Sequence, residues 1–339
     1  MKRQLLGVAA ILLSISTYAQ DNPLWMRYCA ISPDGTTIAF TYKGDIYTVP
    51  STGGRASQIT TNPAHDTKPI WSPDGKKIAF ASDRMGSMDI FEVNKEGGIP
   101  KRLTTHSGNE TPVAYKDAGH ILFLANIMPT AEDAQFPSGQ FQQVYEVNTE
   151  GGRPILFSSM PMEDISINHT GNTLLYHDKK GYEDPWRKHH TSSITRDIWL
   201  CSLNGNRTFR KQTAFNGEDR TPVWASDDKS FYYLSEEKGS FNIFKRDIDG
   251  NTSKQITNHT KHPVRFLSAA SNGTLCYGYD GEIYTVKEGA IPQKVQISIV
   301  TDKNDKDLIR QIKRSGATEI SLSPDAKEIA FGIHLRVGS

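Results

Sequence analysis

Short runs of β-branched and aromatic residues recur along the chain, and polar turns separate them at regular distances. A Ser-Pro-Asp-Gly turn at residues 32–35 leads into Ile-Ala-Phe at residues 38–40, and both features return from residue 72 onward. A third copy, with Ala in place of Gly, occupies residues 323–331. In such a turn Pro fixes φ, Asp bonds its own backbone and Gly accepts positive φ, so each copy predicts a β-hairpin.

Each repeat continues with another apolar strand, a glycine turn and a short closing strand. Residues 45–49 and 89–93 are examples of the apolar strand, and residues 58–60 of the closing one. Weaker copies of the polar turn lie at residues 116–118, 168–171, 226–228 and 271–273. Four short strands per repeat of about forty to fifty residues are typical of a propeller blade. The pattern therefore predicts an all-β fold, a six-bladed β-propeller of four-stranded blades at residues 20–300.

One blade cannot bury both of its faces, so neighbouring blades must pack against each other. The large side chains that we expect between blades are Trp71, Trp224, Phe80, Phe91, Tyr145 and Phe244.

The two ends of the chain differ from the repeats. Lys2 and Arg3 precede an apolar run and small residues, which predicts a signal peptide at residues 1–19 and a periplasmic or secreted protein. No later stretch approaches the ~20 apolar residues of a transmembrane helix, so no membrane span is predicted. Residues 301–317 are highly charged and predict a linker with a possible short helix, and residues 318–339 predict the incomplete first strands of a second propeller.

The charge balance and the cysteine content mainly exclude classes of partner and site. Lys plus Arg number 39 and Asp plus Glu 38, so no global field attracts a polyanion, and we expect no nucleic-acid partner. Cys29, Cys201 and Cys276 lie far apart in apolar segments, which favours three buried thiols over a disulfide or a catalytic cysteine. Nothing in the sequence indicates a cofactor.

An insertion at residues 178–195, in the fourth repeat, brings cationic residues together, and a second insertion occupies residues 127–142 of the third. The candidate peptide-binding cations are Arg187, Lys188, His189, His190 and Arg196. Arg can bind a carboxylate through two nitrogens and Lys adds a point charge, so the C-terminus of a peptide is the expected ligand. The alternative is an elongated hairpin whose charges are solvated or paired. No metal site is predicted, because adjacent histidines on a strand point to opposite faces.

A second group of polar residues precedes successive inner strands. These candidates are His65, Asp66, Glu110, Glu218 and Asp219, and Asn109, Glu163 and Asp164 occupy the same place in their repeats. Stacked blades would arrange them around one mouth of the channel, where carboxylates could hold a peptide amine. The alternative is that they hydrogen-bond loop backbones between blades.

No catalytic residue is predicted. The chain lacks a Gly-x-Ser-x-Gly elbow, and Ser192 or Ser193 beside His190 is better explained as loop polarity than as a hydrolase site.

These motifs resemble known proteins in two ways, one general and one more specific. Residues 69–75 with 78–84 resemble the repeat shared by the Tol-system translocation propeller, prolyl oligopeptidase-type propellers and tricorn proteases. More specifically, Asn-Pro-Leu-Trp-Met-Arg-Tyr at residues 22–28 and the segment at residues 181–193 resemble the N-terminal region of secreted bacterial tricorn-like serine peptidases. This resemblance extends from residue 21 to about residue 331.

In that family a six-bladed propeller is followed by a seven-bladed one, a PDZ domain and the serine peptidase core. The resemblance implies that this chain is the first propeller plus the opening strands of the second. None of its positions matches the family's nucleophile, base or oxyanion residues. The divergence at residues 332–339 suggests a truncated gene, a frameshift or a cloned fragment.

The resemblance implies a non-catalytic propeller that channels or filters peptides for a peptidase core absent from this chain. Its expected partners are peptides or unfolded polypeptide, and the downstream peptidase domains of a parent serine peptidase. An alternative is a stand-alone periplasmic protein-interaction propeller similar to the Tol-system protein. A third is a propeller enzyme with its own active site.

Overall fold

The computed structural model describes residues 23–127, 141–181, 192–300 and 317–333, and these residues form strands and turns without a helix. They divide into two units, residues 1–299 and 300–339, which are described separately. Among the described residues no helix is long and apolar enough to cross a membrane. The predicted signal peptide and most of the predicted linker lie outside the described residues.

The first unit consists of six antiparallel sheets of four strands each. Blade 1 contains β1 (Arg27–Ile31), β2 (Thr37–Tyr42), β3 (Asp45–Pro50) and β5 (Ser57–Gln58). Blade 2 contains β6 (Asp66–Trp71), β7 (Lys77–Ser82), β8 (Asp89–Asn94) and β9 (Lys101–Arg102). Blade 3 contains β10 (Thr111–Asp117), β11 (His120–Ala125), β12 (Gln143–Asn148) and β13 (Ile155–Ser158). Blade 4 contains β14 (Met162–Ile167), β15 (Thr173–Asp178), β16 (Ile198–Ser202) and β17 (Thr208–Lys211). Blade 5 contains β18 (Asp219–Trp224), β19 (Ser230–Ser235), β20 (Asn242–Asp247) and β21 (Ser253–Gln255). Blade 6 contains β22 (Arg265–Ala269), β23 (Leu275–Tyr279), β24 (Glu282–Val286) and β25 (Gln293–Lys294). The predicted six-bladed propeller is confirmed.

The repeated Ser-Pro-Asp-Gly turn joins the first two strands of a blade through side-chain bonds. The Ser32 hydroxyl donates to Asp34 Oδ1 at 2.6 Å and accepts from the Thr37 backbone N–H at 3.0 Å. Gly35 follows with a φ of 76°, in the left-handed region that glycine adopts at little cost. The same residue types therefore give the same turn in each clear copy of the repeat.

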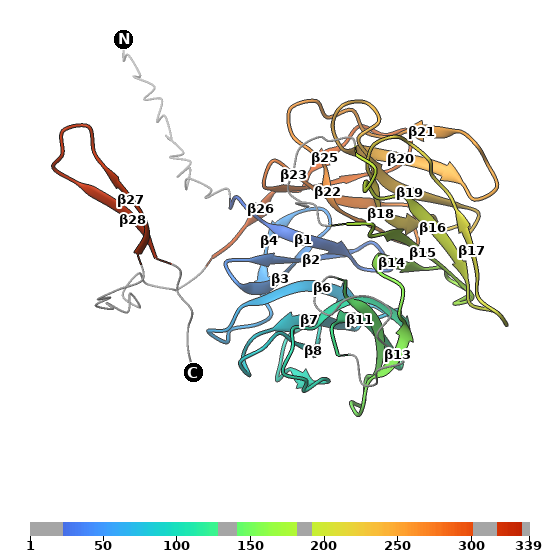
Figure 1. The fold of residues 1–339 in the computed structure, drawn as a ribbon, viewed down its shortest axis with the longest axis horizontal. Coiled ribbons are helices and arrows are strands. Elements are labelled where there is room, and N and C mark those ends of the chain that lie inside the picture. The colour runs from blue at the N-terminus through green and yellow to red at the C-terminus, as the bar shows by residue number, and fades with distance from the viewer. Residues whose placement is uncertain (1–22, 128–140, 182–191, 301–316, 334–339) are drawn as a thin grey trace, which may run out of the picture. The chain divides into compact units, whose positions relative to one another are not determined.

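The sheets follow one another in chain order around a ring, from the blue strands of blade 1 to the orange strands of blade 6, which return beside the first (Figure 1). Two contacts close the ring. On the inside, the Ile31 N–H donates to the Ser268 hydroxyl at 3.0 Å. On the outside, β26 (Ile297–Ser298) pairs in parallel with β4 (Gly54–Arg55). A side chain at Gly53 would place its Cβ 2.7 Å from the Gln296 carbonyl oxygen, so this outer pairing needs a glycine.

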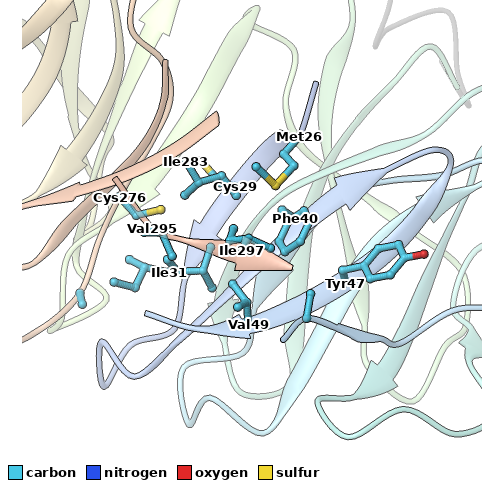
Figure 2. Packing of buried hydrophobic residues seen from close by; sticks show 13 residues of the cluster. Met26, Cys29, Ile31, Phe40, Tyr47, Val49, Cys276, Ile283, Val295 and Ile297 are labelled. Carbon is cyan, nitrogen blue, oxygen red and sulfur yellow. The ribbon is translucent and has the colours of Figure 1, made fainter. Parts of the chain in front are cut away.

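Buried side chains between adjacent blades form the core. Figure 2 shows the cluster at the ring closure, in which Met26, Phe40 and Tyr47 of blade 1 pack with Ile283 of blade 6 and Ile297 of β26. All six predicted inter-blade residues are at most 9% exposed, which confirms their place in the core.

Two tryptophans bind the backbone of the preceding blade. Trp71 Nε1 donates to the Ala30 carbonyl at 2.8 Å, and Trp224 Nε1 donates to the Ser166 carbonyl at 3.0 Å. Each indole therefore fixes the position of one blade against the next.

The second unit contains one described hairpin, β27 (Ala317–Leu322) paired with β28 (Ile329–Ile333). Its turn repeats the bonds of the propeller turns, because the Ser323 hydroxyl donates to Asp325 Oδ1 at 2.6 Å. That this hairpin begins a second propeller stays a prediction.

Candidate functional site in the central channel

A cavity of about 900 Å³ lies between the first strands of the six blades. Because β1, β6, β10, β14, β18 and β22 are the innermost strands, each contributes side chains to its wall. One residue from each strand shows this: Tyr28, Lys68, Thr111, Asp164, Thr221 and Phe266. The cavity is therefore the central channel of the propeller.

The channel wall carries backbone strain at equivalent positions of five blades. In each of these inner strands the pairing with the second strand slips by a bulge, and the residue in the bulge has positive φ. These residues are Tyr28 (52°), Lys68 (53°), Asp164 (49°), Thr221 (52°) and Phe266 (57°). Left-handed backbone costs a residue other than glycine about 1–2 kcal/mol. In blade 3 the equivalent position is Pro112, whose ring does not allow positive φ.

The channel wall is rich in cations. Its cationic residues are Lys68, Lys179, Arg196, Arg220 and Arg265, against the carboxylates of Glu163 and Asp164. The Lys68 Nζ lies 5.8 Å from the centre of the Tyr28 ring and makes no hydrogen bond or ion pair with the described residues. Burial lowers the pKa of Lys68, and the nearby Asp164 and Glu163 oppose that effect. Lys68 is thus a cation on the wall with donors available for a ligand.

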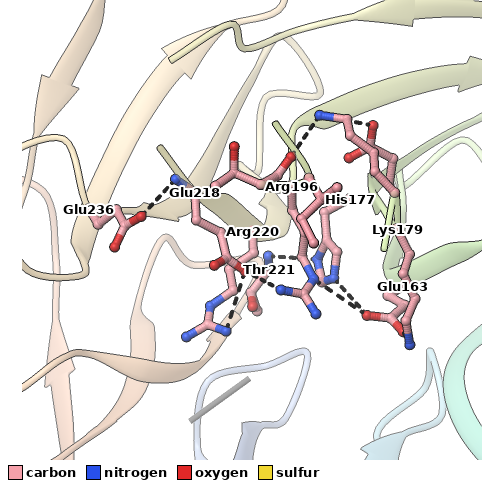
Figure 3. Close-up of polar contacts among 12 residues, drawn as sticks. Glu163, His177, Lys179, Arg196, Glu218, Arg220, Thr221 and Glu236 are labelled. Atoms are coloured by element: carbon pink, nitrogen blue, oxygen red, sulfur yellow. Dashed lines mark hydrogen bonds and ion pairs between the residues drawn. The ribbon is translucent and has the colours of Figure 1, made fainter. Parts of the chain in front are cut away.

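Arg196 joins blades 4 and 5 at the channel wall (Figure 3). Its side chain is buried, its Nη1 is ion-paired with Glu218, and its Nε lies 3.7 Å from Glu163 Oε2. Burial acts to lower the pKa of Arg196, but the Glu218 and Glu163 carboxylates outweigh it and the pKa is raised. The Glu218 backbone N–H in turn donates to Glu236 Oε1 at 2.9 Å.

Arg220 extends this network toward blade 6. Its Nη1 lies 3.7 Å from Glu218 Oε1, and its guanidinium carbon lies 4.1 Å from the centre of the Phe241 ring. Burial lowers the pKa of Arg220 to about 10; Glu218 opposes the change, and Arg265 and Arg196 add to it. One carboxylate thus faces two buried guanidinium groups.

Glu163 is the centre of a second group of ion pairs in blade 4. Its Oε1 accepts from Lys179 Nζ at 2.8 Å, and its Oε2 lies 3.2 Å from His177 Nε2. Burial acts to raise the pKa of Glu163, but His177 and Lys179 outweigh burial and hold it well below its ordinary value. Glu163 is therefore ionised, and its two carboxylate oxygens are bound by Lys179 and His177.

The other side of the His177 ring faces blade 5. Its Nδ1 accepts the Thr221 backbone N–H at 3.3 Å, while the Thr221 hydroxyl donates to Asp164 Oδ2 at 2.6 Å. The left-handed Thr221 is thus held by two partners from blade 4.

The predicted cationic insertion is only partly described. It lies between β15 and β16, the second and third strands of blade 4, as expected, but Arg187, Lys188, His189 and His190 lie outside the described residues. Arg196 lines the channel, with its guanidinium engaged by the carboxylates named above. Peptide binding by this group stays a prediction.

Of the predicted ring of polar residues, Glu163 and Asp164 line the channel, whereas the other carboxylates are buried away from it. Asp66, Glu110, Glu218 and Asp219 are at most 1% exposed and are absent from the channel wall, and His65 is exposed outside it. Both oxygens of Asp66 accept from the Arg84 Nη2, at 2.9 and 3.0 Å. In the folded chain Asp66 and Glu218 hold loops and strands together through their ion pairs with Arg84 and Arg196.

Two of these buried carboxyls occupy equivalent positions in blades 3 and 5. Burial raises the pKa of Glu110 to about 7, with Asp89 adding to the shift and Thr104 and Arg102 opposing it. Burial also raises the pKa of Asp219 to about 7. Both groups therefore titrate near neutral pH.

The sequence reasoning missed most of the channel cations. Lys68 and Arg220 lie two residues and one residue beyond the start of their inner strands, and Arg265 is the first residue of β22. The sequence prediction used only the apolar residues of these strands. The available signal for Lys68 was the repeated Pro-Ile-Trp or Pro-Val-Trp at residues 69–71 and 222–224, because the residue before each copy, Lys68 or Thr221, faces the channel.

The described part of the chain contains no group of three His, Cys, Asp or Glu side chains placed to hold a metal ion. The Ser192 hydroxyl accepts the Ile194 backbone N–H at 3.2 Å, a contact typical of a loop turn.

The sequence matches the tricorn protease N-terminal beta propeller domain over residues 23–290. It is 25% identical over 281 residues to tricorn protease homolog 1 of Streptomyces coelicolor, covering 82% of this chain and 25% of that protein. It is 27% identical over 295 residues to the tricorn protease homolog of Saccharolobus solfataricus, covering 83% of this chain and 26% of that protein. The chain thus spans about a quarter of the length of these curated relatives.

Two solved structures share the fold. A crystal structure of tricorn protease superposes with a TM-score of 0.67 at 20% identity, over 88% of this chain and 28% of that chain. TolB from Acinetobacter baumannii superposes with a TM-score of 0.56 at 15% identity, over 78% of this chain and 61% of that one. Since the family match extends over most of the propeller, this chain belongs to the tricorn protease N-terminal beta propeller domain family.

Proposed function

We propose that this chain is the non-catalytic propeller portion of a tricorn-like serine peptidase, and that its channel binds peptides on their way to or from a peptidase core. The observation that supports this most is the strained wall. Glycine would adopt the five left-handed positions at little cost, yet each carries a side chain that lines the channel. Strain of this kind is typical of positions whose side chains have a functional role.

The charge of the wall favours an anionic end of the peptide. Glu163 already accepts from Lys179, and Asp164 already accepts from the Thr221 hydroxyl. A peptide C-terminus is therefore a better ligand for this wall than a peptide amine. Lys68, without an ion-pair partner among the described residues, is the group that we assign to the carboxylate. The cations of residues 187–190 would act with it if that insertion reaches the same mouth.

Matched peptides with a free or an amidated C-terminus test this proposal by titration against the purified chain. The acid should bind about 5–100-fold more tightly, the range of a charge-assisted pair in a shielded site. Lys68→Met should abolish the preference for the acid. Lys76→Met, at an exposed turn lysine outside the channel, should retain it. Equal binding of acid and amide by the wild type would rule out the assignment.

The second proposal, a stand-alone protein-interaction propeller similar to the Tol-system protein, predicts a folded protein partner and no preference for peptide C-termini. The similarity to TolB reflects the shared fold. Under either proposal the purified chain should not hydrolyse peptides, and turnover that persists through repurification would favour the third alternative, an enzyme.

We also propose that the protein is exported to the periplasm or secreted, on the evidence of the predicted signal peptide. Fractionation of cells that express the full chain tests this, with N-terminal sequencing to locate cleavage near residue 19.

A further inference from the structure

Two of the three cysteines meet where the first and last blades close the ring. Cys29 is on β1 and Cys276 is on β23, and both belong to the buried cluster of Figure 2. The Cys29 Sγ points toward blade 6, where it lies 3.5 Å from the Phe266 carbonyl oxygen. Both thiols are free in the structure and belong to this one cluster.

The backbones at the two cysteines are also close. The Ser268 hydroxyl lies 3.5 Å from the Cys29 carbonyl oxygen and 3.4 Å from the Cys276 carbonyl oxygen. A single hydroxyl can reach both carbonyls only if the two chain segments are adjacent. A disulfide needs Cα atoms about 4.4–6.8 Å apart with side chains directed at each other, so it requires adjacency of this kind between the two strands.

Cys201 has a different environment. It is buried in blade 4, where its Sγ donates to the carbonyl of Ser202 at 3.5 Å, and its cluster contains no second cysteine. It therefore serves as an internal control for the other two.

We propose that Cys29 and Cys276 form a disulfide that joins blade 1 to blade 6 and closes the propeller ring covalently. The two thiols lose two protons and two electrons, and a disulfide-bearing oxidant, such as oxidised glutathione or a thiol–disulfide oxidoreductase, is reduced to two thiols. Cys29 lines the channel, so it forms the mixed disulfide with the oxidant. Cys276, which is fully buried, then attacks the Cys29 sulfur and releases the second thiol of the oxidant.

The burial of Cys276 determines when this disulfide can form. Burial raises the pKa of Cys276, so little thiolate is present in the folded ring and exchange there is slow. Exchange is faster while the ring is still open, before blade 6 packs against blade 1. Refolding under oxidising conditions should therefore give the bond more quickly than oxidation of the folded protein.

Peptide mapping by mass spectrometry tests the proposal on the full chain. Reduced protein is unfolded, refolded in buffers of increasing oxidised-to-reduced glutathione ratio, unfolded again under acid quench and alkylated. We expect a cross-linked peptide pair containing Cys29 and Cys276, lighter than its reduced form by two hydrogen atoms, and an alkylated Cys201. Alkylation of all three thiols at every ratio, or a cross-link to Cys201, would overturn the proposal.

Thermal unfolding gives the second readout. The bond encloses most of the propeller sequence, so the oxidised chain should have a Tm higher than that of the reduced chain by about 5–15 °C. Cys29→Ala and Cys276→Ala should abolish this difference, and Cys201→Ala should retain it. If an alanine variant fails to fold, peptide mapping of the wild-type chain still tests whether the Cys29–Cys276 disulfide forms.

Discussion

The guanidinium of Arg196, on blade 4, is ion-paired with the buried carboxylate of Glu218, which directly precedes the first strand of blade 5. The pair joins two blades beside the channel, and Glu218 also lies 3.7 Å from Arg220 Nη1. Removal of one partner from a buried pair leaves a charge without compensation, which is more costly than loss of the pair itself.

Glu218→Gln should therefore lower the free energy of unfolding by about 3–5 kcal/mol, as measured by urea denaturation. Glu150→Gln is the matched control, because Glu150 also joins two blades, through Lys101 at 2.7 Å, but is exposed. This control should unfold like the wild type. Equal effects of the two substitutions would show that burial of the Arg196 pair is unimportant.

The stability of the propeller should fall as the pH rises toward and beyond neutrality. Glu110 and Asp219 ionise near pH 4 in the unfolded chain but have pKa values of about 7 when folded. The folded state binds more protons between these values, so the stabilisation is fully present below about pH 4 and is lost as the pH rises through about 7. Glu110→Gln and Asp219→Asn, which stay neutral, should each flatten this dependence by an amount on the order of 3 kcal/mol.

Asp74→Asn is the control for that pH series. The Ser72 hydroxyl lowers the pKa of Asp74, so its contribution is present above its ordinary pKa and is lost on acidification. Denaturation curves between pH 4 and pH 8 should show no flattening in this variant. A wild-type stability that is constant over this range would contradict the prediction for Glu110 and Asp219.

The two inter-blade indoles should contribute equally. Trp71→Phe and Trp224→Phe each remove a hydrogen bond to a carbonyl of the preceding blade and part of a buried ring. Each should lower the free energy of unfolding by about 1–3 kcal/mol. Trp25→Phe, at an indole that is 71% exposed, should have little effect in the same denaturation series.

Replacement of a strained channel residue should separate binding from stability. In Thr221→Gly, relief of about 1–2 kcal/mol of left-handed strain is offset by the greater freedom of glycine when unfolded and by loss of the bond to Asp164. The free energy of unfolding should therefore change by less than about 1 kcal/mol. Peptide binding in the channel should weaken.

Thr48→Gly provides the comparison, because Thr48 lies in a regular part of β3 where no strain is relieved. It should destabilise the chain by about 1 kcal/mol or more. If Thr221→Gly is the more destabilising of the two, the strain at position 221 is small.

Periodicity was sufficient to predict the propeller, because each repeat carries its own turn chemistry and apolar strands. The Ser32 and Ser72 turns have identical side-chain bonds, so local sequence determines that hairpin. Inter-blade packing followed as well, since Trp71 and Trp224 recur at one position of the repeat.

The channel was harder to predict, because its left-handed positions share a backbone conformation and no residue type. Tyr28, Asp164 and Phe266 have nothing in common in a sequence. The position of Arg196 in a cationic segment suggested an available guanidinium, whereas its carboxylate partner lies in the next repeat. Such pairing depends on how blades stack and is absent from the local pattern.

Because β4 pairs with β26, the order of synthesis determines how long the edge of β4 stays unpaired. β4 lies between β3 and β5 of blade 1 and is synthesised early, but its partner strand follows blade 6. The edge at Gly54 and Arg55 must therefore stay unpaired until nearly the whole propeller has been translated. During that interval the nascent ring is open and offers an unpaired edge to other chains, so the newborn protein is most prone to misassembly just before the strand that follows blade 6 is made.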